Sequence, residues 1–358
     1  MTNAYTSIAW NRHKAIYDAL LLAGAGAFLA VYVVAAQAAL PALAREPGPD
    51  PIVTIIRATG SLAAALLTLV LCIGPIARFS PRFKPLLYNR RHAGVLTFAV
   101  ALAHAALVTL YYHGFGEMNP LVSLLVNPAV GGTVPFEYFG IAALLALFFL
   151  AATSHDFWLA TLGPRAWKSL HFLAYVAFVL IVAHVLFGAV VREGSLLAGS
   201  LVSAAAAGVA TLHLAAAITQ RRRDRKPEIL AREPPGWIDA GPAADLPDRR
   251  AVALNTPSGK RVALFRNGRT LSALADACAH QGGPLSEGAV VDGCATCPWH
   301  GYQYDPLTGC APPPYTEKVP THRVAIDSRG HALVNPDPEP PGSPPEPARL
   351  TIHGASTS

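Results

Sequence analysis

Four residues in the C-terminal third of the chain have the types and spacing of a metal site. Cys278 and His280 are separated by one residue, and Cys297 and His300 by two, so each of two short segments supplies one thiol and one imidazole. Two thiolates on one iron and two imidazoles on the other make a mixed-ligand [2Fe–2S] cluster, which has a higher reduction potential than an all-cysteine cluster. The same ligand set occurs in zinc fingers, but those usually pair Cys with Cys and His with His along the chain. We therefore interpret all four residues as ligands of a [2Fe–2S] cluster.

The residues around these ligands support the iron–sulfur interpretation. The segments His280-Gln-Gly-Gly-Pro-Leu-Ser-Glu-Gly288 and Cys297-Pro-Trp-His-Gly-Tyr-Gln-Tyr-Asp-Pro-Leu-Thr-Gly309 closely resemble the two cluster-binding loops of the Rieske ferredoxin family. The resemblance spans roughly residues 236–336 and implies an all-β Rieske domain.

The same resemblance implies a tuning role for Tyr304. High-potential Rieske proteins have a serine two residues and a tyrosine four residues after the second ligand histidine, and both donate hydrogen bonds to sulfur, which raises the potential. This chain has Tyr302 and Tyr304 at those positions. We expect Tyr302 to pack against the loop, Tyr304 to be the one side-chain donor, and the cluster to have an intermediate potential.

The cysteines indicate a reducing compartment. Rieske proteins of respiratory bc complexes have a disulfide between the two loops, but Gly283 and Trp299 occupy the matching positions here. We expect Cys294 and Cys310, which flank the second loop, to be free thiols, because disulfides are rare in the cytoplasm.

The composition places the rest of the chain in a bilayer. Hydrophobic residues make up 52% and charged residues 14% of the sequence, and the mean hydropathy is +0.36, which is typical of a membrane protein. Six apolar stretches approach or reach the length that crosses hydrocarbon. They cover residues 15–39, 53–77, 93–112, 136–153, 171–191 and 195–218. We predict a six-helix transmembrane bundle with no cleaved signal peptide.

Basic residues predict the orientation of the bundle. They are concentrated between the second and third spans, between the fourth and fifth, and in Arg221–Lys226 after the sixth. Cytoplasmic loops carry an excess of Lys and Arg. We therefore predict a bacterial-type inner membrane protein with both termini in the cytoplasm. The net charge of +6 is explained by these span ends, and we expect no nucleic-acid partner.

The predicted spans contain histidines. His104 lies in the third span, and His171 and His184 lie in the fifth. Ionisable residues inside spans are usually functional, because hydrocarbon does not solvate them. Paired imidazoles on facing helices are the ligands of b-type heme. Ordinary hydrogen bonds between helices are the alternative for each histidine taken singly.

These spans resemble the ferric-reductase-like transmembrane domain, and within it the heme-binding membrane subunit of the bacterial methionine sulfoxide reductase system. The resemblance covers residues 50–190 and rests on Gly74-Pro-Ile-Ala-Arg78, Arg90-Arg-His-Ala-Gly94, Thr153-Ser154, Leu162-Gly163, Trp167, Leu170-His171, Tyr175 and the two histidines His104 and His184. It implies that His104, His171 and His184 are heme ligands. The resemblance does not support His92 as a heme ligand, because that family often has an apolar residue at the matching position.

The geometry of the predicted helices supports His92 as a heme ligand in part. The third and fifth spans run in the same direction, so His92 could face His171 and His104 could face His184, with axial offsets of about 18 and 20 Å. Steps of twelve and thirteen residues do not return to one helix face, so the two histidines of each helix would project in different directions. Both one heme and two hemes remain open.

The chain therefore divides into four parts. Residues 1–218 form the membrane domain, 219–235 a basic cytoplasmic linker, 236–336 the Rieske domain and 337–358 a proline-rich tail that we expect to be disordered. Strands are predicted at 251–254, 261–265, 270–274, 322–326 and 331–334. We find no internal sequence repeat.

Together these features predict a membrane electron-transfer protein. Electrons would pass between a cytoplasmic [2Fe–2S] cluster and heme b, toward the outer face. The expected donor is a soluble cytoplasmic reductase or ferredoxin, and the expected acceptor is periplasmic or in the membrane. A terminal ferric or quinone reductase and a redox sensor are the alternatives, and the chain has no GxGxxG motif for binding a dinucleotide.

Overall fold

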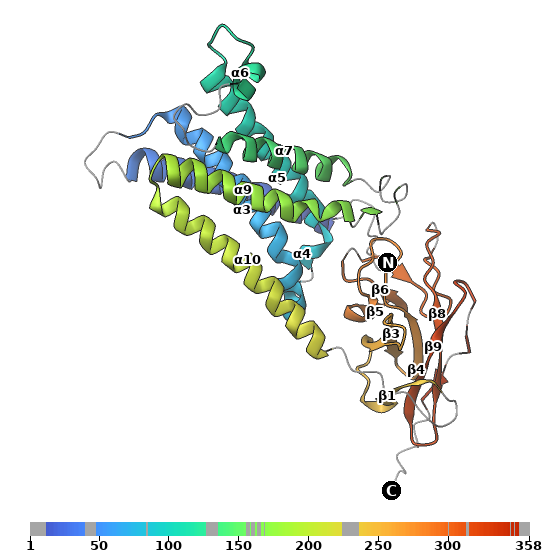
Figure 1. The fold of residues 1–358 in the computed structure, drawn as a ribbon. Coiled ribbons are helices and arrows are strands. Elements are labelled where there is room, and N and C mark those ends of the chain that lie inside the picture. Colours follow the sequence, from blue (N-terminus) through green and yellow to red (C-terminus); the bar gives the residue numbers. More distant parts are fainter. Residues whose placement is uncertain are drawn as a thin grey trace. The chain divides into compact units, whose positions relative to one another are not determined.

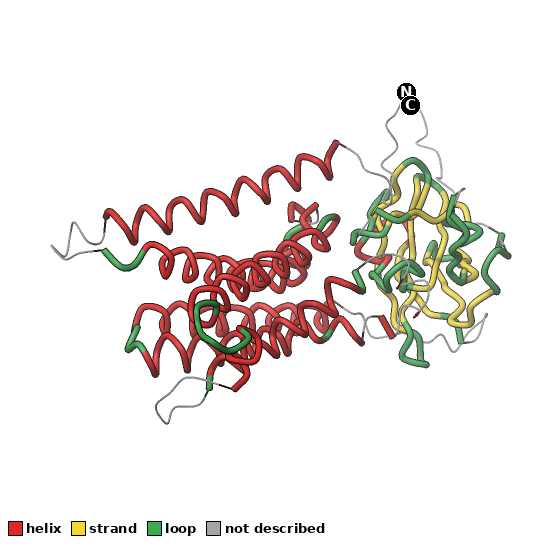
Figure 2. The backbone as a smooth tube through the Cα atoms, turned by 90° about the horizontal axis from the view of Figure 1, so that it is seen from above, coloured by secondary structure: helices red, strands yellow, loops and turns green. Residues whose placement is uncertain are grey.

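The protein consists of a helical unit and a β unit. The computed structural model describes residues 12–39, 48–83, 85–126, 135–154, 158, 162, 166–167, 169–223, 236–299, 301–312, 315–343, 345–346 and 348–350. The chain divides near residue 216 into two compact units, of which Trp10–Ala216 is the helical one. Figure 2 shows helices in one unit and strands in the other.

The described residues of the helical unit include six long or medium helices. These are α1 (Arg12–Val34), α3 (Pro51–Phe79), α5 (Arg90–Val108), α7 (Phe136–Ala152), α9 (Leu173–Val185) and α10 (Leu196–Arg223). Short segments connect or extend them: η1 (Ala35–Ala39), η2 (Pro81–Phe83), α4 (Pro85–Tyr88), η3 (Thr109–His113), α6 (Pro120–Val126) and η4 (Leu186–Arg192).

Five helical stretches among the described residues are long and apolar enough to cross a membrane. They are Lys14–Ala38, Pro51–Phe79, Arg90–His113, Ser169–Arg192 and Leu196–Thr219. The stretch predicted as a sixth span contains the apolar helix α7, which is shorter at 17 residues. A multi-pass membrane domain is therefore confirmed, with one helix shorter than expected.

Helices α3, α5, α7 and α9 pack into a four-helix bundle. Contacts join α3 to α5, α5 to α7, α7 to α9 and α9 to α3, and these helices lie beside one another in Figure 1. Leu67, Leu147 and Phe178 lie in one buried cluster inside the bundle. The N-terminus of helix α3 is capped by Asp50, which accepts hydrogen bonds from the Ile52 and Val53 amides. Pro51 occupies the first turn of this helix.

Helices α5 and α9 both continue into π-helical segments. Segment η3 follows α5 directly, and η4 follows α9 directly. Such widened turns often occur at functional sites. Helix α10 continues to Arg223, so the predicted linker begins later than Thr219, and residues 224–235 lie outside the described part.

The β unit is an antiparallel sheet. Its strands are β1 (Ile238–Pro242), β2 (Arg250–Asn255), β3 (Arg261–Asn267), β4 (Thr270–Ala275), β5 (Ala289–Val291), β6 (Cys294–Thr296), β7 (Gln303–Tyr304), β8 (Thr321–Ile326), β9 (His331–Glu339) and β10 (Ala348–Arg349). Their order is β1-β9-β8-β4-β3-β2-β5-β6-β7, and β10 pairs with β4. The five predicted strands are confirmed as β2, β3, β4, β8 and β9.

The sheet supports two hydrophobic cores. The first contains Ile238, Leu264 and Leu271, and the second contains Phe265, Leu285 and Tyr304. Strand β3 contributes to both, because its side chains alternate between the two faces of the sheet. The second core also contains Cys278 and Cys297, so two of the candidate ligands are packed in this core.

The expectation of a disordered tail from residue 337 is wrong for the part that the structure describes. Strand β9 continues to Glu339, with His322 of β8 opposite Pro338. Among the described strands β1 reaches only as far as Val334 on β9, and proline is tolerated where one side of a strand is not paired. Ala348 and Arg349 then pair with Leu271 and Thr270 of β4, and residues 351–358 lie outside the described part.

Candidate cofactor sites

The two Rieske-like loops bring the predicted cysteine ligands together. Cys278 lies between β4 and the short helix η6 (Leu285–Glu287), and Cys297 directly follows β6. Both side chains are buried, at 2% and 1% exposure, and the two thiols are hydrogen bonded to each other.

Backbone hydrogen bonds hold each loop in a tight turn. The Cys278 amide donates to the Gly283 carbonyl at 2.9 Å, and the Cys297 amide donates to the Tyr302 carbonyl at 2.7 Å. Gly283 approaches Cys297 so closely that a Cβ there would lie 2.8 Å from the Cys297 sulfur. This close approach explains a glycine at a position where bc-type proteins have the disulfide cysteine.

Tyr304 is placed to donate a hydrogen bond to Cys278. Its Oη lies 3.3 Å from the Cys278 Sγ and accepts from the Ala279 amide at 3.0 Å. An oxygen that accepts from an amide has its own hydrogen available for the sulfur. Burial and the charge of Cys278 raise the pKa of Tyr304 far above its ordinary value, so the phenol keeps the hydrogen that it donates.

The electrostatics of the loops favour a thiolate at Cys278. Burial by itself raises the pKa of this thiol, but hydrogen bonds from Cys297 and Tyr304 and the nearby His280 outweigh it and lower the pKa to about 6. Cysteine binds metals as the thiolate. The buried site is therefore prepared for a positively charged group.

Tyr302 packs as the sequence predicts, and it has a partner that the sequence did not reveal. Its ring stacks on the ring of His280, with centroids 5.0 Å apart and planes at 9°. Its hydroxyl donates to the Glu317 carboxylate. Burial and this hydrogen bond raise the pKa of Tyr302. The Tyr302–Glu317 pair lies 15 residues apart in sequence, and no local motif marks it.

The fourth candidate ligand, His300, lies outside the described residues. Within the described part no three His, Cys, Asp or Glu side chains are grouped as a metal site. The donor set that the structure does show, two adjacent buried thiols with a buried imidazole nearby and a tyrosine donor, fits a [2Fe–2S] cluster.

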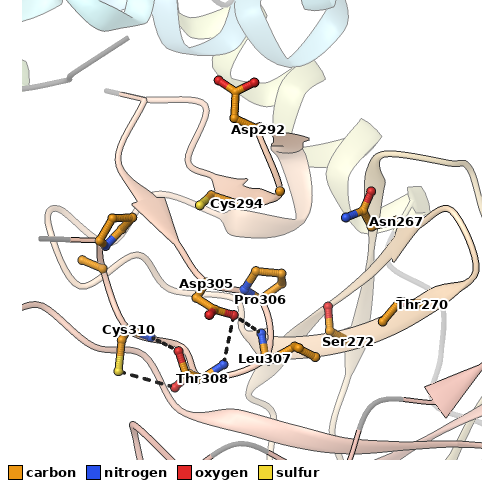
Figure 3. A pocket seen from close by; sticks show the side chains of 13 residues that line it. Asn267, Thr270, Ser272, Asp292, Cys294, Asp305, Pro306, Leu307, Thr308 and Cys310 are labelled. Atoms are coloured by element: carbon orange, nitrogen blue, oxygen red, sulfur yellow. Dashed lines mark hydrogen bonds between the residues drawn. The ribbon is translucent and has the colours of Figure 1, made fainter. Parts of the chain in front are cut away.

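Cys294 and Cys310 line a separate pocket of about 570 Å³ (Figure 3). All five cysteines lie in the described residues and are free thiols, as predicted for these two. Asp305 shapes the pocket wall by accepting from the Leu307 and Thr308 amides. Burial, followed by Asp305 and Asp292, raises the pKa of Cys294, so this thiol is a poor nucleophile.

The helical unit brings together two of the histidines. His104 on α5 and His184 on α9 have ring centroids 6.4 Å apart, with planes at 84°. An iron with two axial imidazoles needs about 2 Å for each metal–nitrogen bond and about 1.1 Å from each nitrogen to its ring centre, or about 6.2 Å in all. The observed separation fits a shared iron.

Each of these rings is oriented by a backbone carbonyl of a neighbouring helix. Nδ1 of His104 donates to the Ile56 carbonyl of α3 at 2.9 Å, and Nδ1 of His184 donates to the Phe136 carbonyl of α7 at 2.9 Å. A carbonyl only accepts, so Nδ1 carries the hydrogen and the lone pair is on Nε2. Metal-binding histidines are typically oriented in this way.

His92 and His171 lie in different surroundings. His92 binds Asp18 of α1, with Nδ1 2.8 Å from the carboxylate. His171 donates from Nδ1 to the Trp167 carbonyl at 3.0 Å and stacks on the Trp167 ring at 3.6 Å. His92 and His104 thus contact different neighbouring helices, as the step of twelve residues between them predicts.

Comparisons with known proteins match both units of the chain. Residues 59–182 match the ferric reductase like transmembrane component family, and residues 236–336 match the Rieske [2Fe-2S] domain family. The protein-methionine-sulfoxide reductase heme-binding subunit MsrQ of Caulobacter vibrioides is 33% identical over 160 residues, which are 44% of this chain and 71% of that subunit. The chain belongs to the MsrQ family.

Other proteins match a smaller share of this MsrQ-family chain. Cholesterol 7-desaturase nvd 1 of Ciona intestinalis is 33% identical over 106 residues, and the match spans only 22% of that protein. A solved complex of oxygenase and ferredoxin in carbazole 1,9a-dioxygenase is 26% identical and covers 29% of this chain and 95% of that one, with a TM-score of 0.27.

Proposed function

We propose that this protein transfers electrons between its Rieske domain and its transmembrane bundle, and from there to an acceptor at the outer face of a bacterial inner membrane. The observation that carries the proposal is the placement of His104 and His184 at the separation of two axial ligands in a chain that also has a Rieske [2Fe-2S] domain. MsrQ relatives are named as heme-binding subunits, which supports b heme as the group held by this pair.

Each group has its own set of protein ligands in this proposal. The [2Fe–2S] cluster is held by Cys278, His280, Cys297 and His300, and the heme by His104 and His184. A bound cluster and a bound b heme each accept and release one electron at a time. The carbonyls of Ile56 and Phe136 keep the hydrogens on Nδ1, and Tyr304 supplies a hydrogen bond to a cluster sulfur.

The proposed topology has six spans with both termini in the cytoplasm. Helix α7 is about 26 Å long at 1.5 Å per residue, slightly less than the hydrocarbon thickness, so its flanks complete the crossing. The basic residues at span ends support a cytoplasmic Rieske domain, and its proposed donor is a soluble reductase or ferredoxin. The acceptor is then periplasmic or in the membrane.

A second heme at His92 and His171 is a second candidate. It is supported by the hydrogen bonds that Nδ1 of each ring makes, to Asp18 and to the Trp167 carbonyl. A carboxylate or carbonyl on the outer nitrogen is the usual orienting partner of a metal-bound imidazole.

A redox titration of the purified protein in detergent tests the proposal. Optical spectra report the heme and electron paramagnetic resonance (EPR) reports the cluster, so one experiment gives the cofactors and the downhill direction. We expect both signals and a cluster potential at or below that of the heme. Protein that binds zinc without iron, or that binds no heme, would refute it.

A further inference from the structure

Two glycines lie against the rings of the paired histidines. A Cβ built on Gly60 of α3 would lie 2.9 Å from Cε1 and 3.0 Å from Nδ1 of His104. A Cβ built on Gly140 of α7 would lie 2.9 Å from Nδ1 and 3.0 Å from Cε1 of His184. Carbon atoms do not pack this closely in proteins, so any larger residue must displace the ring.

Neither glycine is needed for the backbone. Both lie inside regular α-helices, where glycine is less favourable than alanine. Glycine inside a helix often permits a close approach, and here the approaching group is an imidazole in each case.

The two contacts are built in the same way in two helical hairpins. His104 and the Ile56 carbonyl are 48 residues apart, and so are His184 and the Phe136 carbonyl. Each glycine follows its carbonyl residue by four positions, one helical turn later. The α3–α5 and α7–α9 hairpins therefore repeat one arrangement, in which a carbonyl and a glycine surface from one helix hold a ring from the other.

This arrangement fixes how each ring is turned. The carbonyl determines the direction of the Nδ1 hydrogen, and the glycine lets the Nδ1–Cε1 edge of the ring lie flush against the facing helix. Two such contacts, one on each side, leave the planes crossed at 84°. A methyl group at either glycine must rotate the ring or pull it from its carbonyl.

We propose that Gly60 and Gly140 are positioning residues that set the crossing angle of the two axial imidazole planes. The inference rests on the proposed function, because it concerns heme held by His104 and His184. The crossing angle matters because it controls the electronic structure of low-spin ferric heme. Crossed planes give a highly anisotropic EPR signal, and parallel planes give a rhombic one.

The test compares Gly60→Ala and Gly140→Ala with two matched controls in the full-length protein. Gly26→Ala on α1 and Gly208→Ala on α10 are also helical, and nothing lies within 4 Å of either position. Low-temperature EPR, heme content and the Rieske signal are measured for each. The Rieske signal per protein shows that the β unit has folded, and the heme content shows whether the helical unit still binds its cofactor.

We expect a highly anisotropic low-spin signal in the wild type and in both controls. In Gly60→Ala and Gly140→Ala this signal is lost and replaced by a rhombic low-spin or a high-spin signal, with the Rieske signal intact. The inference is overturned if both variants keep the wild-type signal. It is also overturned if the wild type is rhombic, an outcome that does not depend on the folding of any variant. Wild-type protein with no heme would instead refute the proposed function.

Discussion

Removing the hydroxyl of Tyr304 measures how strongly the protein tunes the cluster. Tyr304→Phe deletes the donor that lies 3.3 Å from the Cys278 sulfur and leaves the buried ring in place. The reduced cluster is more negative than the oxidised one and so gains more from this hydrogen bond. We expect the reduction potential to fall.

The size of the fall follows from the energy of the bond. A hydrogen bond to a charged group contributes about 1.5–3 kcal/mol, and only the part that differs between oxidation states shifts the potential. Taking about half, or roughly 0.8–1.5 kcal/mol, and about 59 mV for each 1.4 kcal/mol in a one-electron couple, the fall is about 30–60 mV. Loss of the oxygen also leaves the Ala279 amide without this acceptor, at a cost of about 1–3 kcal/mol in stability.

The assay is a potentiometric titration of the Rieske EPR signal, with Tyr302→Phe as the matched control. The Tyr302 hydroxyl bonds to Glu317, so its removal is expected to shift the potential by less than half as much. Heme content stays unchanged in both variants. No shift in Tyr304→Phe, or an equal shift in Tyr302→Phe, would show that Tyr304 is not the donor to the cluster.

Three further outcomes are expected. His104→Ala or His184→Ala reduces or abolishes the low-spin heme spectrum, whereas His92→Ala removes at most a second heme; normal heme in both of the first two variants would exclude their pairing. His280→Ala loses the Rieske EPR signal while heme is retained, and metal analysis that finds zinc in place of iron in the wild type would contradict the cluster assignment. Burial lowers the pKa of His322, so its stabilising effect is full above the unfolded-state pKa of about 6.5 and is lost as the pH falls toward the folded-state value. His322→Phe should therefore flatten the loss of Rieske-domain thermal stability below about pH 6.5, and an unchanged acid dependence in thermal unfolding would contradict this.

The cluster loops could be predicted because the residues that identify them lie close together in the sequence. The Cys and His spacing and the flanking glycines lie within short segments, and the five predicted strands carry clear alternation and turn residues. Strands β5, β6 and β7 have only two or three residues each, too few for a pattern. The prediction of a disordered tail is wrong because it rests on the prolines of this segment, whereas the described part of the tail is ordered by pairing with β8 and β4.

The contacts in the bundle could be predicted only in part. Matching levels on parallel helices pointed to His104 with His184, which the structure brings together. The contact of His92 with Asp18 depends on where α1 packs, which hydropathy does not reveal. The sequence does not predict the contacts of Gly60 and Gly140 with the histidine rings. A glycine in an apolar helix indicates a close contact only when the facing side chain is known.

The pairing of β10 with β4 changes how the C-terminal end can be handled experimentally. Ala348 and Leu350 pack against the first core of the β unit, and β10 covers the edge of β4 at Thr270 and Leu271, beside the part covered by β8. Truncation at residue 337 would remove this cover and expose unpaired amides next to Leu271, which is otherwise fully buried. Exposed strand edges promote association between copies of a chain. A shortened protein would therefore aggregate because of its exposed sheet edge, and a loss of function in it would not by itself assign a role to the removed residues.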